Sequence, residues 1–308
     1  MQARLDWDRD GADWPLREYS RFVETGTQAC GLRWHVQHLP STRAGAPRCL
    51  LIHGTGASTH TWRDVAPLLR EHFELLSIDL PGHAFTAMPA GGIHSPFLGL
   101  QGMALALGRL LATMEFSPDL IVGHSAGAAI GARLCLDGAA HPKLLVSLNG
   151  ALLPLGGLAG KIFAPAARLM VAVPGVSRLF AWRASDAQVI QGLLDSTGSA
   201  LDARGRELYR RLASNPGHVE GALGMMAGWD LPALEPELTR LEPTLVLMVG
   251  THDATVPPTE ADRLLARLGG RVPARKVVFE GLGHLAHEER PAAFVQALAA
   301  AWLVGRPA

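Results

Sequence analysis

The chain has 308 residues, of which 48% are hydrophobic and 18% are charged, and this suits one large globular domain that carries an insertion. Lys and Arg together number 28, as do Asp and Glu, so the formal charge is zero and nucleic-acid binding is not expected. The longest uninterrupted apolar run, Ala297–Val304, is too short to span a membrane.

The start of the chain and its cysteines indicate a reducing, cytoplasmic setting. Four aspartates lie within the first 13 residues, where a secretory signal would require a continuous apolar stretch. Cys30, Cys49 and Cys135 are odd in number and lack C-x-x-C spacing. We therefore expect three reduced thiols, with neither a disulfide framework nor a structural zinc site.

Strands and helices then alternate along the chain. Arg21–Glu24 and Leu32–His38 suit an antiparallel edge, and the later alternation predicts right-handed βαβ units in a mostly parallel sheet. The further predicted strands are Cys49–His53, Leu75–Asp79, Leu120–Gly123, Leu144–Leu148, Leu245–Val249 and Lys276–Phe279. The predicted helices are Thr59–Leu69, Gly99–Met114, Ala126–Leu136, Thr259–Leu268 and Pro291–Leu303.

A glycine-rich turn, HGTGAS, follows the strand that begins at Cys49. Its flexible backbone is rich in N–H donors, and we expect the N–H of Thr55 to be one of two donors to an oxyanion. A plain strand-to-helix turn and a phosphate-binding loop are the alternatives. No G-x-G-x-x-G pattern is completed, which argues against a dinucleotide site.

The sequence GHSAG lies directly between a predicted strand and a predicted helix of small residues. This is the setting of a nucleophile elbow, where a sharp turn exposes the serine and requires small neighbours such as Gly123 and Gly127. We therefore predict Ser125 as the nucleophile and the N–H of Ala126 as the second oxyanion donor. A glycine-rich turn without chemistry is the alternative, but the flanking strand and helix favour the nucleophile.

The alternation stops after the strand that ends at Leu148. The interval 150–229 contains helical patches, Gly and Pro but no convincing strand, so we expect a helical cap inserted into a core formed by 1–149 and 230–308. Within it, the segment around Lys161 lacks the first glycine and the Ser or Thr of a P-loop, which argues against ATP binding.

An acid and a histidine follow the last two predicted strands in the order that this topology requires. Asp253 lies in GTHD and His284 lies in GLGH. We predict that His284 is the general base for Ser125 and that Asp253 orients it. A turn aspartate and a surface histidine are the ordinary interpretations of each residue alone, and the set of three favours catalysis.

Thirteen histidines are present, but no H-E-x-x-H pattern or cluster of carboxylates accompanies them, so neither a protein-bound metal nor a cofactor is predicted. His53 and His124 flank the expected site. Orientation of these rings by backbone hydrogen bonds is favoured over direct catalysis, and they remain secondary candidates for substrate contact.

The segments HGTGAS, DLPGH, GHSAG, GTHD and GLGH together resemble the α/β-hydrolase family from Arg21 to Leu303. The resemblance implies a mostly parallel central sheet flanked by helices, with a helical cap. A serine at the elbow argues against the haloalkane dehalogenase and epoxide hydrolase branches, which use an aspartate. Ala84 stands where many relatives have glycine, so the loop there is expected to be less flexible.

Longer segments resemble the magnesium-chelatase accessory protein family of bacteriochlorophyll biosynthesis, a pathway of photosynthesis. They include HGTGASTHTWRD, GHSAGAAIGARLCLDG, PGHVEGALGMMAGWDL and GLGHLAHEERP. The resemblance implies a small-molecule substrate, a tetrapyrrole at the magnesium-protoporphyrin stage, or magnesium chelatase as partner. Magnesium would then arrive with the pigment and not on protein ligands.

Large apolar residues of the insertion could cover a flat macrocycle, although such residues are more often packed core. The candidate contacts are Trp62, Met225, Met226 and Trp229. His218 could approach a bound metal, but a surface position is the more usual one.

We therefore expect a serine hydrolase that acts by acyl transfer on an ester or related carbonyl compound. The alternative is an accessory protein that binds a tetrapyrrole or assists the chelatase and keeps the triad as a relic of its fold. The complete Ser, His and Asp set favours chemistry.

Overall fold

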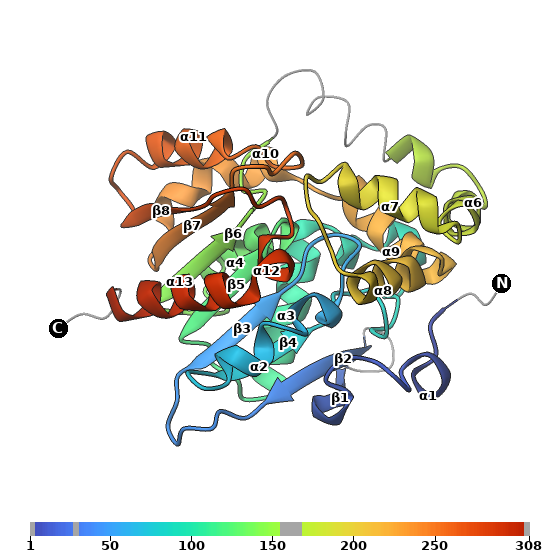
Figure 1. Cartoon of the computed structure of the whole chain (residues 1–308), viewed down its shortest axis with the longest axis horizontal. Helices are drawn as coiled ribbons and strands as arrows, with labels where there is room; N and C mark the ends of the chain where they lie inside the picture. Colours follow the sequence, from blue (N-terminus) through green and yellow to red (C-terminus); the bar gives the residue numbers. More distant parts are fainter. Residues whose placement is uncertain (1–3, 27–30, 155–167, 305–308) are drawn as a thin grey trace.

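The computed structural model describes residues 4–26, 31–154 and 168–304, and an eight-stranded sheet runs through its centre (Figure 1). The strand order is β1-β2-β4-β3-β5-β6-β7-β8. β2 is antiparallel to β1 and β4, and the remaining neighbours are parallel. The strands are β1 (Ser20–Thr25), β2 (Leu32–Leu39), β3 (Arg48–Ile52), β4 (Glu74–Ile78), β5 (Leu120–His124), β6 (Leu144–Leu148), β7 (Thr244–Gly250) and β8 (Ala274–Phe279). The prediction of a mostly parallel sheet with an antiparallel edge is confirmed.

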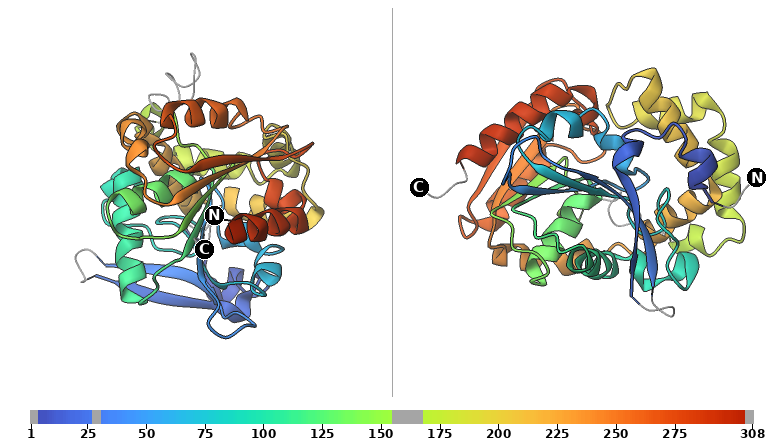
Figure 2. Two further views of the ribbon diagram at one scale, coloured as in Figure 1. Left: turned by 90° about the vertical axis from the view of Figure 1, so that its left-hand side faces the viewer. Right: turned by 90° about the horizontal axis from the view of Figure 1, so that it is seen from below.

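The central strands are continuous aliphatic runs because both faces of the sheet are covered. On one face, α3 (Leu100–Thr113), α4 (Ala126–Leu136) and α11 (Thr259–Leu268) contribute to one hydrophobic cluster. On the other face, α2 (Ala66–Leu69) and α13 (Pro291–Val304) contribute to a second cluster. The two further views in Figure 2 show the sheet between these helical layers.

The prediction of a single helix over Thr59–Leu69 is wrong. A 3-10 turn, η2 (Thr59–Trp62), comes first, and α2 starts only at Ala66. Pro67 lies in the first turn of α2, because its ring and missing N–H do not fit the interior of a longer helix. The Thr59 N–H instead donates to the Asp79 carboxylate over 2.7 Å.

Between β6 and β7 the described residues form helices and contain no strand. They are α6 (Val176–Arg183), α7 (Ala187–Asp195), α8 (Ala203–Ala213), α9 (Pro216–Ala227) and α10 (Leu231–Leu234). α6 packs on α9, α7 packs on α8, and α8 contacts α9. The helices α6 to α9 therefore lie together at one side of the sheet (Figure 1).

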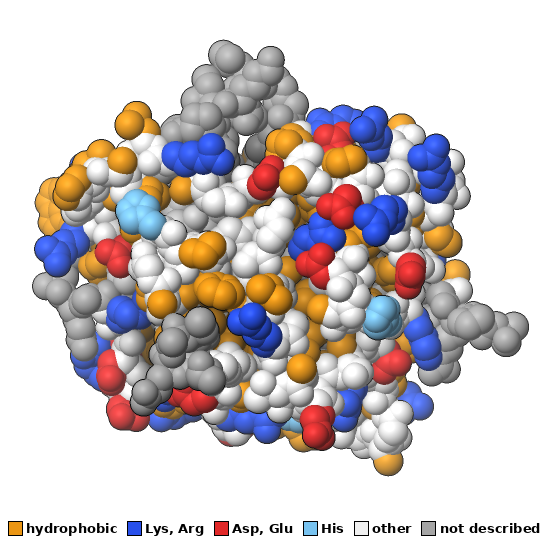
Figure 3. All heavy atoms as spheres, turned by 180° about the vertical axis from the view of Figure 1, so that it is seen from behind, with side chains coloured by type: hydrophobic (Ala, Val, Ile, Leu, Met, Phe, Trp, Pro, Cys, Tyr) orange, Lys and Arg blue, Asp and Glu red, His pale blue; other side chains and the backbone are white. Residues whose placement is uncertain are grey.

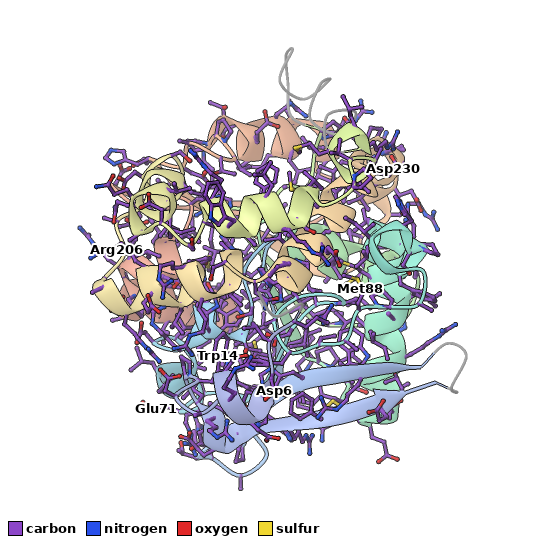
Figure 4. All side chains as sticks on the ribbon, turned by 90° about the vertical axis from the view of Figure 1, so that its right-hand side faces the viewer. Asp6, Trp14, Glu71, Met88, Arg206 and Asp230 are labelled. Carbon is purple, nitrogen blue, oxygen red and sulfur yellow. The ribbon has the colours of Figure 1, made fainter. Side chains whose placement is uncertain are left out.

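The N-terminal segment packs against these helices, which the sequence pattern did not predict. Its short helix α1 (Trp7–Asp10) is followed by Trp14, which is buried in a cluster with Leu208 and Leu212 of α8. Figure 4 shows Trp14 between this segment and the helix that carries Arg206. Asp13 pairs with two arginines of α8, at 3.0 and 2.7 Å, and holds the two parts together.

Five further short elements belong to the described structure. They are the helix α12 (Ala286–Glu289) and the 3-10 turns η1 (Arg17–Tyr19), η3 (Gly92–His94), η4 (Pro96–Leu98) and η5 (Glu235–Arg240). Cys49 and Cys135 are free thiols, as expected, and Cys30 lies outside the described residues.

Candidate active site

The turn between β5 and α4 places Ser125 in a strained conformation, with φ 51° and ψ −119°. This turn is tight on both sides of the serine. A Cβ atom at Gly123 would lie 2.4 Å from the Ala128 nitrogen, and one at Gly127 would lie 2.3 Å from the Ile52 oxygen. The geometry is that expected of a nucleophile elbow, where only glycine fits at these two positions.

Backbone hydrogen bonds on both its N–H and its carbonyl hold Ser125 in this conformation. Its N–H donates to Leu148 O over 3.0 Å, and its carbonyl accepts from the N–H groups of Ala128 and Ala151. Backbone strain of this kind costs about 1 to 3 kcal/mol and persists only where the surroundings enforce it. The fold therefore holds the serine in a conformation that its own backbone disfavours.

His284 and Asp253 meet at the same edge of the sheet. The His284 Nδ1 lies 2.8 Å from Asp253 Oδ2, and the other carboxylate oxygen accepts from the N–H groups of Thr255 and Val256, both at 2.8 Å. The Asp253 side chain is fully buried. A buried carboxylate on Nδ1 fixes the tautomer in which Nε2 is free to accept a proton. The His284 ring lies 4.8 Å from that of His124, the neighbour of Ser125.

Asn149 fixes the loop that carries His284, and sequence reasoning missed it. Its Nδ2 donates to the carbonyls of Gly283 and His284 at 2.9 and 2.8 Å, and its Oδ1 accepts from the Gly250 N–H at 2.8 Å. His124 Nε2 donates to the same His284 carbonyl over 2.9 Å. A polar residue directly after the buried strand β6 was the available signal, since the neighbouring parallel strands end at this edge.

The HGTGAS turn lies directly against the elbow. A Cβ atom at Gly54 would be 2.9 Å from the Ser125 Cβ, so the backbone of this turn faces the serine at van der Waals distance. Thr55 follows in the same turn, and Ala126 begins α4, where the first N–H groups of a helix have no intrahelical partner. The HGTGAS turn and the start of α4 therefore lie on different sides of Ser125, and donation by Thr55 and Ala126 to an oxyanion stays a prediction.

Helix α9 holds the HGTGAS turn from the other side. The Thr55 hydroxyl contacts the Met225 sulfur at 3.4 Å, and His218 Nε2 donates to Gly56 O over 3.0 Å. His218 Nδ1 accepts from the Ala84 N–H at 3.0 Å. The expected surface position of His218 is wrong, because it is buried and both ring nitrogens are engaged by main chain. Ala84 itself has φ 41°, a conformation that favours glycine.

His53 is oriented by backbone hydrogen bonds, the role that the sequence favoured for it. Its Nδ1 donates to Gly54 O over 2.7 Å, and its Nε2 accepts from the Leu80 N–H over 2.9 Å. Both ring nitrogens are thus occupied by backbone, and burial lowers the pKa of the ring. His53 therefore orders the HGTGAS turn as a neutral imidazole.

The other predicted contacts are distributed between core and site. Trp62 has no exposed surface and packs against the His287 ring at 4.7 Å, which is the environment of a core residue. Met225 is fully buried and reaches Thr55. Met226 and Trp229 are half-buried, and Trp229 packs on the cluster that contains α3 and α4. Of the four apolar candidates, Met225 has a direct contact with the candidate site.

A buried polar network lies beside the site. The Glu288 carboxylate accepts from Thr61 Oγ1 at 2.5 Å, Arg63 Nη1 at 2.6 Å and Tyr209 Oη at 2.8 Å. Burial raises the pKa of Glu288 against the opposing effect of Arg63. His287 donates to Thr61 Oγ1 over 2.7 Å, and burial lowers its pKa to about 3. The network ties α8 to η2 and α12.

Within the described residues, no group of three or more His, Cys, Asp or Glu is arranged to hold a metal ion. No helix of the described structure is long and apolar enough to cross a membrane.

The buried histidines predict that stability falls in mild acid. Burial lowers the pKa of His53, His60, His83, His124, His218 and His287, that of His218 to about 4. The unfolded chain takes up protons near pH 6.5 that the folded chain does not bind, so stability is full above about pH 6.5 and is lost as the pH falls towards 4. Below about pH 6.5, each such ring lowers the free energy of unfolding by about 1.4 kcal/mol per pH unit until its own pKa in the folded chain is reached.

Thermal unfolding followed by circular dichroism should therefore show Tm falling steeply between pH 6.5 and 4.5. The variant His141→Gln removes an exposed histidine, and we expect its Tm to fall over this pH interval as that of the wild type does. A Tm that stays constant over the interval would contradict the neutral, buried state of these rings.

The comparisons with known proteins agree with this architecture. Residues 49–297 match the model of the alpha/beta hydrolase family. The magnesium-chelatase 30 kDa subunit of Rhodobacter capsulatus is 36% identical over 278 residues, covering 90% of this chain and 92% of that protein.

Two solved structures share the fold at low sequence identity. A thermophilic esterase from Thermogutta terrifontis has a TM-score of 0.71 at 18% identity and covers 93% of this chain and all of its own. The enol-lactonase from Burkholderia xenovorans LB400 has a TM-score of 0.67 at 18% identity, over 90% of this chain and 98% of its own. With its family match, its relative over nearly the whole length and its elbow geometry, the chain belongs to the alpha/beta hydrolase family.

Proposed function

We propose that the protein is a serine hydrolase in which Ser125 is the nucleophile, His284 the general base and Asp253 the residue that orients the base. The observation that carries this proposal is the 2.8 Å bond between His284 Nδ1 and a fully buried Asp253, beside a serine held in a strained turn. Activated groups of this kind cluster at functional sites.

The reaction is acyl transfer from an ester or related carbonyl compound. Ser125 Oγ attacks the carbonyl carbon while its proton passes to His284 Nε2, and the N–H groups of Thr55 and Ala126 stabilise the negative oxygen. The imidazolium then protonates the leaving group as the acyl bond breaks. Water, deprotonated by the same imidazole, releases the acid from Ser125 and restores the enzyme.

We propose the substrate class on the support of a relative's name and of the helical segment between β6 and β7. A relative named magnesium-chelatase 30 kDa subunit supports a substrate in bacteriochlorophyll or chlorophyll biosynthesis, at the magnesium-protoporphyrin stage. We also propose a cytoplasmic location, which the free thiols of Cys49 and Cys135 support. We place the boundary of the cap at 150–229, on a core of 1–149 and 230–308. Met225, Met226 and Trp229 are the residues of this cap that we assign to substrate contact.

The second candidate is a non-catalytic protein that binds a tetrapyrrole or assists magnesium chelatase. The word subunit in the relative's name favours it, since a subunit can act through association alone. This candidate requires pigment binding that does not depend on Ser125.

Labelling with a fluorophosphonate probe separates the two candidates. The hydrolase proposal predicts one modified peptide containing Ser125, no labelling of Ser125→Ala, and protection by magnesium protoporphyrin or its methyl ester. A folded protein that binds the pigment but is not labelled would overturn the hydrolase proposal and support the binding protein. Labelling without protection by pigment would support a serine hydrolase whose substrate lies outside the tetrapyrroles.

A further inference from the structure

The outer helices of the insertion expose large apolar side chains. Among the described residues, twelve large hydrophobic side chains are exposed, and seven of them lie in the segment 169–193. They are Leu169, Val173, Leu179, Phe180, Trp182, Val189 and Leu193, with exposed fractions of 36 to 72%. We call these seven side chains, together with Arg168, Arg178 and Arg183, the outer face. Exposed apolar side chains that are scattered over a surface are ordinary, but a concentration of them within one short segment indicates an interaction surface.

Helix α6 buries small side chains and exposes large apolar ones, which is the opposite of an ordinary amphipathic helix. Its buried residues are the small Ser177 and Ala181, whereas Leu179 and Trp182 face outward and are 58 and 60% exposed. A helix that served only to cover the core would bury its largest side chains. The inward face of α6 has its polar group paired, since Ser177 Oγ donates to the Glu220 carboxylate of α9 over 3.2 Å.

Helix α7 continues the outer face. It buries Ile190 and Leu194, while Val189 and Leu193 stand one turn apart on the outside. Because α6 packs on α9 and α7 packs on α8, α6 and α7 form the outer layer of the insertion. They lie on the side of the molecule that Figure 4 faces. In Figure 3, hydrophobic and basic side chains occupy the margin where α6 lies, on the left in that view.

The charge on this surface is mostly positive, and the exposed N-cap of α7, Asp186, is the one carboxylate between residues 169 and 193. Residues 168–185 contain Arg168, Arg178 and Arg183 and no carboxylate, in a chain whose net charge is zero. Within the described part of the chain, Arg178 and Arg183 belong to no salt bridge. By contrast, three of the four arginines of the neighbouring α8, namely Arg204, Arg210 and Arg211, pair with Asp13 or Glu207. The outer face therefore presents unpaired positive charge among apolar groups.

We propose that the outer face binds the surface of an anionic lipid bilayer. Trp, Phe and Leu side chains enter the boundary between headgroups and acyl chains, and arginines beside them meet the negative headgroups. A second copy of the chain fits less well, because a symmetric contact would bring the three arginines of each copy together. Surface binding of this kind would hold the helical insertion at the membrane.

Vesicle sedimentation tests this proposal directly, and it does not depend on the hydrolase activity because the Ser125→Ala chain can be used throughout. The protein should sediment with vesicles of phosphatidylcholine and phosphatidylglycerol, and at least tenfold more weakly with phosphatidylcholine alone. An arginine near an anionic surface gives roughly a fivefold gain in binding. The double variant Arg178→Glu/Arg183→Glu should therefore lose more than twentyfold in affinity, and added salt should weaken the wild type.

A matched pair of apolar variants locates the surface. Leu179→Ser/Trp182→Ser should reduce binding at least tenfold, whereas Leu303→Ser/Val304→Ser, equally exposed at the far end of α13, should not change it. Absence of sedimentation, or equal loss in both double variants, would overturn the proposal. A concentration-dependent dimer that Leu179→Ser/Trp182→Ser abolishes, without vesicle binding, would overturn it in favour of a second copy.

Discussion

Replacing Ser125 with alanine is expected to lower kcat for a short-chain aryl ester by at least about a thousandfold. The oxyanion donors remain in this variant, so a small residual rate above that of water is expected. The physical reason is that His284 has no hydroxyl to deprotonate, although its bond to Asp253 is unchanged. Steady-state kinetics measure the loss, and a Tm close to that of the wild type shows that the fold is intact.

Glycine at the same position provides the matched comparison. Ser125 has φ 51°, which a residue without Cβ adopts more easily. Ser125→Gly should therefore be as inactive as Ser125→Ala but more stable, by about 1 kcal/mol within the range of backbone strain at such sites. Turnover that survives in either variant would refute the assignment of the nucleophile. Equal stability of the two variants would show that the turn stores no strain.

Local patterns predicted the sheet and the candidate triad because both depend on short segments. Continuous aliphatic runs identify β5 and β6, which are buried on every residue. The ends of parallel strands share one edge of a sheet, so Ser125, Asp253 and His284 could be placed together from the order of their strands alone. The geometry of the elbow then followed from two glycines.

The residues that sequence reasoning missed act through contacts between distant segments. Glu288 meets Thr61, Arg63 and Tyr209, which come from elements 79 to 227 positions away in the chain. Nothing local distinguishes His218 from a surface histidine, because its partners at Gly56 and Ala84 lie in other loops. Pro67 was a local signal against the long helix at Thr59, and the spacing of apolar residues outweighed it.

Asn149 is the missed residue with the largest expected effect on turnover. Its side chain satisfies the Gly250 N–H and the carbonyls of Gly283 and His284, and removing it leaves three buried backbone groups without that partner. Asn149→Gly retains the backbone freedom that φ 44° requires. We therefore expect Asn149→Gly to lower kcat about tenfold to a hundredfold, the range produced by misplacing a catalytic group by about 1 Å, with KM nearly unchanged.

A purely structural role would predict a different result, and Ser199 offers the control. The Ser199 hydroxyl accepts from the Leu285 N–H over 2.8 Å, next to His284, but does not touch the His284 carbonyl. Ser199→Ala should lower Tm, since a buried N–H loses its partner at a cost of about 1 to 3 kcal/mol, while the rate of fluorophosphonate labelling at Ser125 stays near that of the wild type. Asn149→Gly should slow that labelling as much as it slows kcat. If labelling falls equally in both variants, Asn149 only stabilises the loop, whereas a selective loss shows that it positions the base.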